Sequence, residues 1–316
     1  MKTEVLVSHT SEEARDKWVT ALRARLPDQY TVVTEPGPQV KHLVAWSPPP
    51  ELFSRLTQLQ TCFSAAAGVD HLLGNPSLPA ELPVFRLEDA GMAGQMARYV
   101  RHEVERVLLR KQTYETQQSE RNWTEHSATD PGELPVGLLG FGVLGRAIAK
   151  TLARDGYPVT AFRRQAGNHL EQLDSDTSVR LVGGTDQWEN FLATCRVLVL
   201  IAPLTDATRH IIDAKSLATL PTGAAVINVG RGELIDTAAL IDALKSKHLA
   251  GASLDVFDTE PLPEQDPLWA MSSVRITPHV SALTLTEPAA AQVANGIMAF
   301  DQGQPVTGSV DRALGY

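Results

Sequence analysis

The run Gly140-Phe141-Gly142-Val143-Leu144-Gly145 constrains this chain more than any other feature of its sequence. The apolar stretch 136–139 before it predicts a short buried strand, residues 146–154 after it predict a helix, and 158–162 a second strand. In such a βαβ unit the glycines allow a tight turn and the close approach of a pyrophosphate to the helix N-terminus. We therefore predict a dinucleotide-binding sheet whose cofactor contacts include Gly140, Gly142, Val143, Leu144 and Gly145.

The end of the second strand selects the cofactor. An NAD site places Asp or Glu there to hold the ribose 2′-hydroxyl. This chain has Arg163 and Arg164 instead, and no acid before Glu171. Because a guanidinium offers a bidentate fork to phosphate oxygens, the sequence predicts NADPH in preference to NADH. The alternative is a solvated basic turn.

Composition narrows the class of protein. The 316 residues are enough for two domains, and 43% apolar with 21% charged residues is ordinary for a globular chain. The net charge of −9 disfavours nucleic-acid and anionic-membrane partners. Cys62 and Cys195 stand alone, so we expect no disulfide and no metal site, and a reducing, cytoplasmic location. No signal-peptide core and no apolar run of membrane-spanning length is visible.

Strands and helices alternate along both halves of the chain. In the first third we expect strands at 4–8, 30–34, 43–46 and before Ala67, with a helix at 11–26, which together predict a small parallel sheet. Apolar residues at helical spacing between 92 and 109 predict a long helix that bridges two domains. Further strands are expected at 197–202, 225–229, 251–256 and 274–277, with a helix at 235–244; the polar stretch 168–186 receives no assignment.

Three polar residues follow these later strands. Arg231 comes after Ile-Asn-Val-Gly, Glu260 lies in the loop after 251–256, and His279 follows Ile-Thr-Pro. Taken singly, each has an ordinary explanation as a turn or surface residue. Together, at the carboxyl ends of parallel strands where ligands bind, they form a chemical set.

The set suits the reduction of a carbonyl group. Arg231 can hold a substrate carboxylate and polarise the neighbouring carbonyl oxygen. His279 can give a proton to that oxygen as hydride arrives at the carbon. Glu260, bonded to the other ring nitrogen of the imidazole, would fix its tautomer and favour its charged form.

The chain resembles the D-isomer-specific 2-hydroxyacid dehydrogenases over nearly its whole length. The resemblance is carried by five motifs: GFGVLG at 140–145, PLTDATRHII at 203–212, INVGRGELID at 227–236, LDVFDTEPLP at 254–263 and TPHVSA at 277–282. Within that family it is most similar to reductases of glyoxylate and hydroxypyruvate, through WSPPP at 46–50, AAAGVDHLL at 65–73, FRLEDAGMAGQM at 85–96 and VDRALGY at 310–316.

The resemblance implies an α/β fold of two Rossmann-like domains. These are a flavodoxin-like substrate domain, 1–98 and 284–316, and a doubly wound dinucleotide-binding domain, 99–283. It implies Arg231, Glu260 and His279 as catalytic residues, with Arg231 and His279 also touching substrate. It further implies substrate contacts by Trp46, Ala67, Gly68 and Val69, and cofactor contacts by Pro203, Asn228, Val229 and Asp255.

The function so implied is NADPH-dependent reduction of a short 2-keto acid, glyoxylate or hydroxypyruvate, to the D-2-hydroxy acid by a homodimer. Two alternatives stay open, a reductase of bulkier keto acids such as phenylpyruvate and a non-catalytic NAD(P)-sensing protein similar to a corepressor. The chain departs from many family members where Ser281 and Ala282 replace two glycines, which makes the pocket wall bulkier.

Overall fold

The computed structural model describes residues 2–316 and divides the chain into two compact units. One unit joins Met1–Met92 to Thr284–Tyr316, and the other is Ala93–Leu283. Residue 99, where the dinucleotide-binding domain is expected from sequence to begin, lies within the helix Ala93–Leu108, and the assignment of the two domains to substrate and cofactor stays a prediction.

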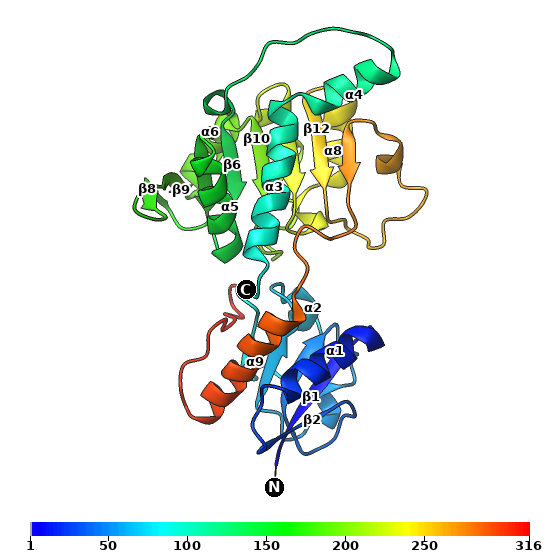
Figure 1. Cartoon of the computed structure of the whole chain (residues 1–316), viewed down its shortest axis with the longest axis vertical. Coiled ribbons are helices and arrows are strands. Elements are labelled where there is room, and N and C mark those ends of the chain that lie inside the picture. Colours follow the sequence, from blue (N-terminus) through cyan, green and yellow to red (C-terminus); the bar gives the residue numbers. More distant parts are fainter. Residues whose placement is uncertain (1) are drawn as a thin grey trace. The chain divides into compact units, whose positions relative to one another are not determined.

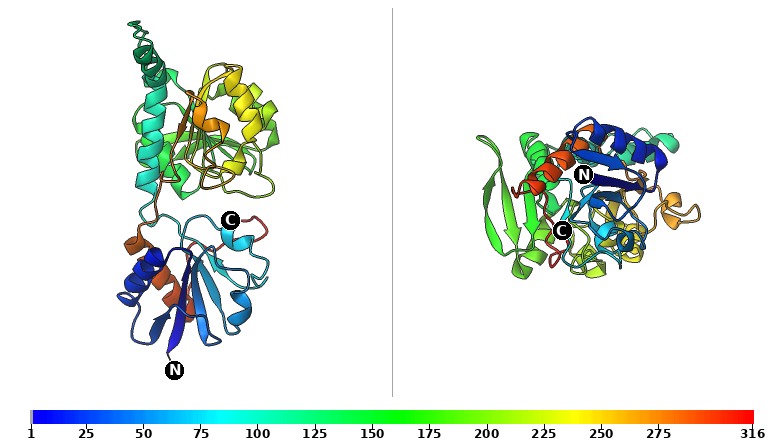
Figure 2. Two further views of the ribbon diagram at one scale, coloured as in Figure 1. Left: turned by 90° about the vertical axis from the view of Figure 1, so that its right-hand side faces the viewer. Right: turned by 90° about the horizontal axis from the view of Figure 1, so that it is seen from below.

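The first unit is built on a five-stranded parallel sheet in the order β2-β1-β3-β4-β5. This order is that of flavodoxin-like folds. Helices α1 and α9 pack together on one face of the sheet, whereas η1 and α2 contribute to the apolar core of the other face (Figure 2). The elements are β1 (Thr3–His9), α1 (Glu12–Arg23), β2 (Tyr30–Val33), β3 (Val40–Trp46), η1 (Phe53–Arg55), β4 (Thr61–Ser64), α2 (Asp70–Leu73), β5 (Val84–Phe85) and α9 (Thr286–Asp301).

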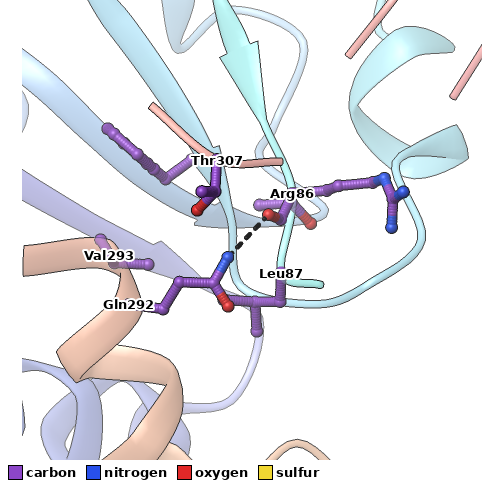
Figure 3. Close-up of a pocket in the computed structure, with 7 residues that line it drawn as sticks. Arg86, Leu87, Gln292, Val293 and Thr307 are labelled. Atoms are coloured by element: carbon purple, nitrogen blue, oxygen red, sulfur yellow. Dashed lines mark hydrogen bonds between the residues drawn. The ribbon is translucent and has the colours of Figure 1, made fainter. Parts of the chain in front are cut away.

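The C-terminal segment closes the edge of this sheet. Ser309 bridges Phe85 of β5, and the Gly308 carbonyl accepts from the amide of Arg86 at 2.8 Å. Gln292 of α9 fixes the chain just after β5, because its amide donates to the Arg86 carbonyl at 3.2 Å (Figure 3). The Arg86 guanidinium points away from Gln292 in the same view. The segment that leaves β5 is therefore held from two sides.

A buried histidine ties α9 to the same sheet. His42 of β3 is fully buried, and its Nδ1 lies 2.7 Å from the Thr61 hydroxyl. Its Nε2 lies 3.2 Å from one carboxylate oxygen of Asp301, and the other oxygen accepts from the Tyr30 hydroxyl at 2.8 Å. Burial lowers the pKa of His42, although Asp301 acts in the opposite direction. The buried imidazole thus connects β3 with α9 and β4 through polar contacts.

The second unit is built on an eight-stranded sheet in the order β13-β12-β11-β10-β6-β7-β9-β8. All neighbouring strands are parallel except β8, which runs antiparallel to β9 at the edge. The strand order reverses between β6 and β10, where doubly wound sheets bind their ligands. Its strands are β6 (Val136–Leu139), β7 (Val159–Arg163), β8 (Gly167–Gln172), β9 (Ser178–Gly183), β10 (Val197–Leu200), β11 (Ala224–Asn228), β12 (Leu249–Leu254) and β13 (Val274–Ile276).

Helices cover both faces of this sheet. On one face α3 and α5 lie side by side and bury an apolar layer against β6, β7 and β10 (Figure 1). On the other, α6, α7 and α8 bury the second layer. The helices are α3 (Ala93–Leu108), α4 (Lys111–Ser119), η2 (Pro131–Glu133), α5 (Val143–Arg154), η3 (Thr185–Gln187), α6 (Trp188–Thr194), α7 (Ala214–Thr219), η4 (Gly232–Leu234), α8 (Thr237–Lys245) and η5 (Pro267–Ala270). Among the described residues, no helix combines the length and apolar character needed to cross a membrane.

The predicted α/β architecture is confirmed, and so are the βαβ unit and the long helix. The unassigned stretch 168–186 contains most of the β8–β9 hairpin. Side chains of α5 hold this hairpin: Arg146 lies 2.8 Å from Glu171, and Lys150 and Arg154 lie 2.9 and 2.7 Å from Asp174. The hydrogen bond from Lys150, helped by the amide of Asp176 and the charge of Arg154, holds the pKa of Asp174 far below its usual range.

Candidate active site

The glycine motif occupies the turn between β6 and α5. Gly140 has φ +110°, and a Cβ there would lie 2.7 Å from the backbone nitrogen of Ala202, so only glycine fits. Gly142 caps α5, and a Cβ built on it would meet nothing within 4 Å. The start of α5, with Val143 and Leu144, therefore faces open space on the Gly142 side. Its first N–H groups have no partner inside the helix, which suits a pyrophosphate.

The end of β7 carries the predicted phosphate-binding arginines. Arg163 is the last residue of β7 and is half-buried, and Arg164 after it is exposed. The buried Nε of Arg163 has no hydrogen-bond partner among residues 2–316. Because a buried N–H without an acceptor is costly, this atom is suited to receive an anionic oxygen.

The loop after β11 presents Arg231. Asn228, the last residue of β11, donates its side-chain amide to the Arg231 carbonyl at 2.7 Å and accepts from the Gly230 amide at 3.1 Å. The Arg231 guanidinium donates to the Gly230 carbonyl at 2.8 Å. Gly232 packs directly on the backbone of residues 257–258, so this loop lies against the loop that carries Glu260.

The loops after β12 and β13 bring two predicted catalytic residues together. Nδ1 of His279 lies 2.8 Å from Oε2 of Glu260, and the other carboxylate oxygen accepts from the Phe257 amide at 3.0 Å. Both side chains are a little over one-third exposed, so solvent and a small ligand can reach the imidazole. Nε2 of His279 is then the atom available to a substrate oxygen.

Asp255 holds the backbone around His279. Its carboxylate is fully buried and accepts from the Thr277 hydroxyl at 2.6 Å and from the amides of Val280 and Ser281 at 2.9 and 2.8 Å. Its carbonyl accepts from the His279 amide at 2.8 Å. These contacts occupy both carboxylate oxygens, whereas the expected contact of Asp255 with a cofactor stays a prediction, as it does for Pro203 and Val229.

The other unit carries the predicted substrate loop. The amides of Ala67, Gly68 and Val69 donate to no group among residues 2–316. The Ser64 hydroxyl shapes this loop by donating to the Gly68 carbonyl at 3.0 Å. Three successive free N–H groups suit a carboxylate. Trp46, at the end of β3, packs against His71 with ring centroids 4.3 Å apart and the ring planes inclined by 45°.

The residues that support His279 carry no sequence signal. Tyr99 of α3 reaches Thr277 through its hydroxyl, and Gln95 binds the backbone of Leu283. Gln95 lies in the motif 85–96 and Tyr99 in the helix that follows it, but neither position predicts a contact with residues 277–283. No group of three or more His, Cys, Asp or Glu side chains within residues 2–316 is arranged to hold a metal ion.

Comparison with known proteins points to one family. The family model described as D-isomer specific 2-hydroxyacid dehydrogenase, NAD binding domain, matches residues 106–281, more than half of the chain. The chain is 35% identical to glyoxylate/hydroxypyruvate reductase A of Serratia proteamaculans, over 95% of this chain and 96% of that protein. It is 33% identical to the protein of the same name from Photorhabdus laumondii, over 99% and 100%.

Solved structures agree in fold. A D-isomer specific 2-hydroxyacid dehydrogenase from Xanthobacter autotrophicus, in complex with NADPH and MES, superposes with a TM-score of 0.91 at 36% identity, over 99% of this chain and all of that one. An NADPH-dependent glyoxylate/hydroxypyruvate reductase from Sinorhizobium meliloti, in complex with NADP and sulfate, gives 0.89 at 31% identity with full coverage of both. With its glycine motif, sheet order and His279–Glu260 pair, this chain belongs to the D-isomer specific 2-hydroxyacid dehydrogenase family.

Proposed function

We propose that this enzyme uses NADPH to reduce a short 2-keto acid, glyoxylate or hydroxypyruvate, to the D-2-hydroxy acid. The observation that carries the proposal is the His279–Glu260 pair, which stands at the same sheet edge as the glycine motif. The names of the relatives from Serratia and Sinorhizobium support the substrate and the cofactor.

The residues present fit NADPH. The cradle at Gly140 and Gly142 would take the pyrophosphate, and the unpartnered Nε of Arg163 would meet the 2′-phosphate, with Arg164 beside it. When bound, NADPH supplies a hydride for the keto carbon. The protein then has to hold the substrate and deliver a proton.

The chain's own residues supply these two functions. Arg231 would bind the substrate carboxylate and polarise the keto oxygen. His279 would donate the proton on Nε2 to that oxygen as the carbon is reduced. Glu260 would hold Nδ1 and so keep the ring in the orientation that the transfer needs.

We assign these functions to separate parts of the chain. The unit Ala93–Leu283 would bind the cofactor and supply Arg231 and His279. The unit Met1–Met92 with Thr284–Tyr316 would be the substrate domain, whose free amides at 67–69 can donate to a carboxylate. Two buried free cysteines accord with a cytoplasmic location.

We also propose a homodimer. Three large apolar side chains lie exposed on and around α4, and Trp123 is fully exposed. These are Leu109, Tyr114 and Trp123. A second copy of the chain would cover these side chains, since exposed apolar side chains close together on a surface favour association. Light scattering should give twice the 34.3 kDa of one chain, and a single-chain mass would contradict the proposal.

The experiment that tests the activity is a substrate panel. Purified protein with NADPH is given glyoxylate, hydroxypyruvate and phenylpyruvate, and the loss of NADPH absorbance is followed. We expect the highest kcat/KM with one of the two short acids. A preference for phenylpyruvate would reassign the substrate, and no oxidation with any acid would favour a non-catalytic cofactor sensor.

A further inference from the structure

The loop that carries His279 adopts a conformation that needs support. His279 has φ +55°, in the left-handed region that only a few per cent of non-glycine residues adopt, histidine more often than most. Such a backbone persists only where surrounding contacts determine it. The relevant contacts are therefore those that hold residues 277–281.

Those contacts converge on one buried carboxylate. Asp255, fully buried at the end of β12, accepts from the amides of Val280 and Ser281 and from the Thr277 hydroxyl. Three donors around one carboxylate fix the path of the chain on both sides of His279. The position of the imidazole thus depends on where this carboxylate and Thr277 are held.

Tyr99 extends the network to α3. Its hydroxyl lies 2.7 Å from the Thr277 hydroxyl. A threonine hydroxyl has a single hydrogen, which Thr277 gives to Asp255, so Tyr99 is the donor to Thr277. Burial raises the pKa of Tyr99 to about 12, so it remains a donor at all pH values at which the enzyme would work.

A second contact holds the far end of the same segment. The Gln95 side chain donates to the Leu283 carbonyl at 2.9 Å and accepts from the Leu283 amide at 3.3 Å. His279 thus lies between two points, Thr277 and Leu283, that are fixed to the first turns of α3.

We propose that Tyr99 is a positioning residue for the proton donor, acting through Thr277 and Asp255 to hold the His279 loop in its strained conformation. This inference rests on the proposed function, because it assigns a purpose to the geometry of His279. It gives α3 a task beyond packing on the sheet.

The test compares Tyr99→Phe with a matched control, Tyr157→Phe. Tyr157 lies in the same unit, and its hydroxyl has no hydrogen bond among residues 2–316. We expect Tyr99→Phe to lower kcat about three- to tenfold, the usual effect of one hydrogen bond, with the KM for NADPH unchanged. Thr277→Val should lower kcat further, and Thr277→Ser, which keeps the hydroxyl, should restore most of it. Tyr157→Phe should leave kcat as in the wild type.

A second measurement does not depend on turnover. Hydrogen exchange of the Val280 and Ser281 amides, which donate to Asp255, should be faster in Tyr99→Phe than in the wild type and in Tyr157→Phe. If the wild type reduces keto acids, an unchanged kcat in Tyr99→Phe and Thr277→Val overturns the proposal. If the wild type reduces none, the proposed function fails by itself, and unchanged exchange at the two amides then overturns the positioning role.

Discussion

Nδ1 of His279 and Oε2 of Glu260 lie 2.8 Å apart although 19 residues separate them in the chain. The contact arises because β12 and β13 are parallel neighbours, so the loops that follow them start at the same edge of the sheet. A carboxylate in this position leaves Nε2 as the ring nitrogen that faces a ligand.

If His279 is the proton donor, its removal should affect turnover and not cofactor binding. We expect His279→Ala to lower kcat by about 10²- to 10⁴-fold, the usual contribution of an acid–base group. The dissociation constant for NADPH, measured by fluorescence titration, should stay within a factor of about two of the wild type, because no cofactor-binding role is assigned to His279. His102→Ala, which changes an exposed histidine on α3, serves as control. A nearly normal kcat in His279→Ala would show that the proton comes from elsewhere.

Glu260→Gln tests whether the charge at this position matters beyond its shape. The amide keeps the size of the side chain but replaces the carboxylate that bonds Nδ1 with a neutral group, which makes a weaker hydrogen bond. We expect kcat for keto-acid reduction to fall about tenfold or more, and less than in His279→Ala, since the acid itself remains. Steady-state kinetics at saturating NADPH measures kcat of both variants. Equal kcat in Glu260→Gln and the wild type would show that Glu260 only stabilises its loop and takes no part in the proton transfer.

Cofactor selection should reside at the end of β7. The double variant Arg163→Ala with Arg164→Ala should raise the KM for NADPH about ten- to a hundredfold, the cost of one or two charged hydrogen bonds, with little change for NADH. Arg196→Ala is the control, because Arg196 directly precedes β10 and so lies at the amino ends of the parallel strands, whereas Arg163 lies at the carboxyl end of β7. An equal rise for both cofactors, or a wild type that prefers NADH, would refute this assignment.

His42 should make the stability of the protein depend on pH. Burial lowers the pKa of His42 in the folded state, so the unfolded chain binds the proton first as the pH falls. The contribution of neutral His42 is then complete above its unfolded pKa of about 6.5 and is lost as the pH falls through the window below it, by at most ~1.4 kcal/mol per pH unit. Urea unfolding at several pH values measures this. His42→Gln should have a lower free energy of unfolding at every pH, but that free energy should fall less steeply within this window. If the free energies of the variant and the wild type fell in parallel with pH, the role of His42 would be contradicted.

Features with local signatures could be predicted from the sequence. The strand, the glycines and the helix of the βαβ unit are neighbours in the chain, so residues 136–163 already specify their arrangement. The positions of Arg231, Glu260 and His279 followed from the rule that parallel strands end at one edge, and the structure places the last two in contact.

Features that depend on distant partners could not be predicted. The β8 strand is polar and largely exposed, so it has no apolar alternation, and it is held by ion pairs with α5. The strand β9 was not predicted, because it lies in the same polar stretch. Likewise, the Tyr99–Thr277 hydrogen bond joins residues 178 positions apart, and neither residue type indicates a function by itself.

The most direct test of the central claim is the stoichiometry and stereochemistry of one reaction. The purified protein is given hydroxypyruvate and a limiting amount of NADPH, and the glycerate formed is resolved on a chiral column. The account predicts one D-glycerate for each NADPH oxidised, and none with His279→Ala over the same time. NADPH consumed without glycerate, L-glycerate as the product, or no oxidation at all would contradict it.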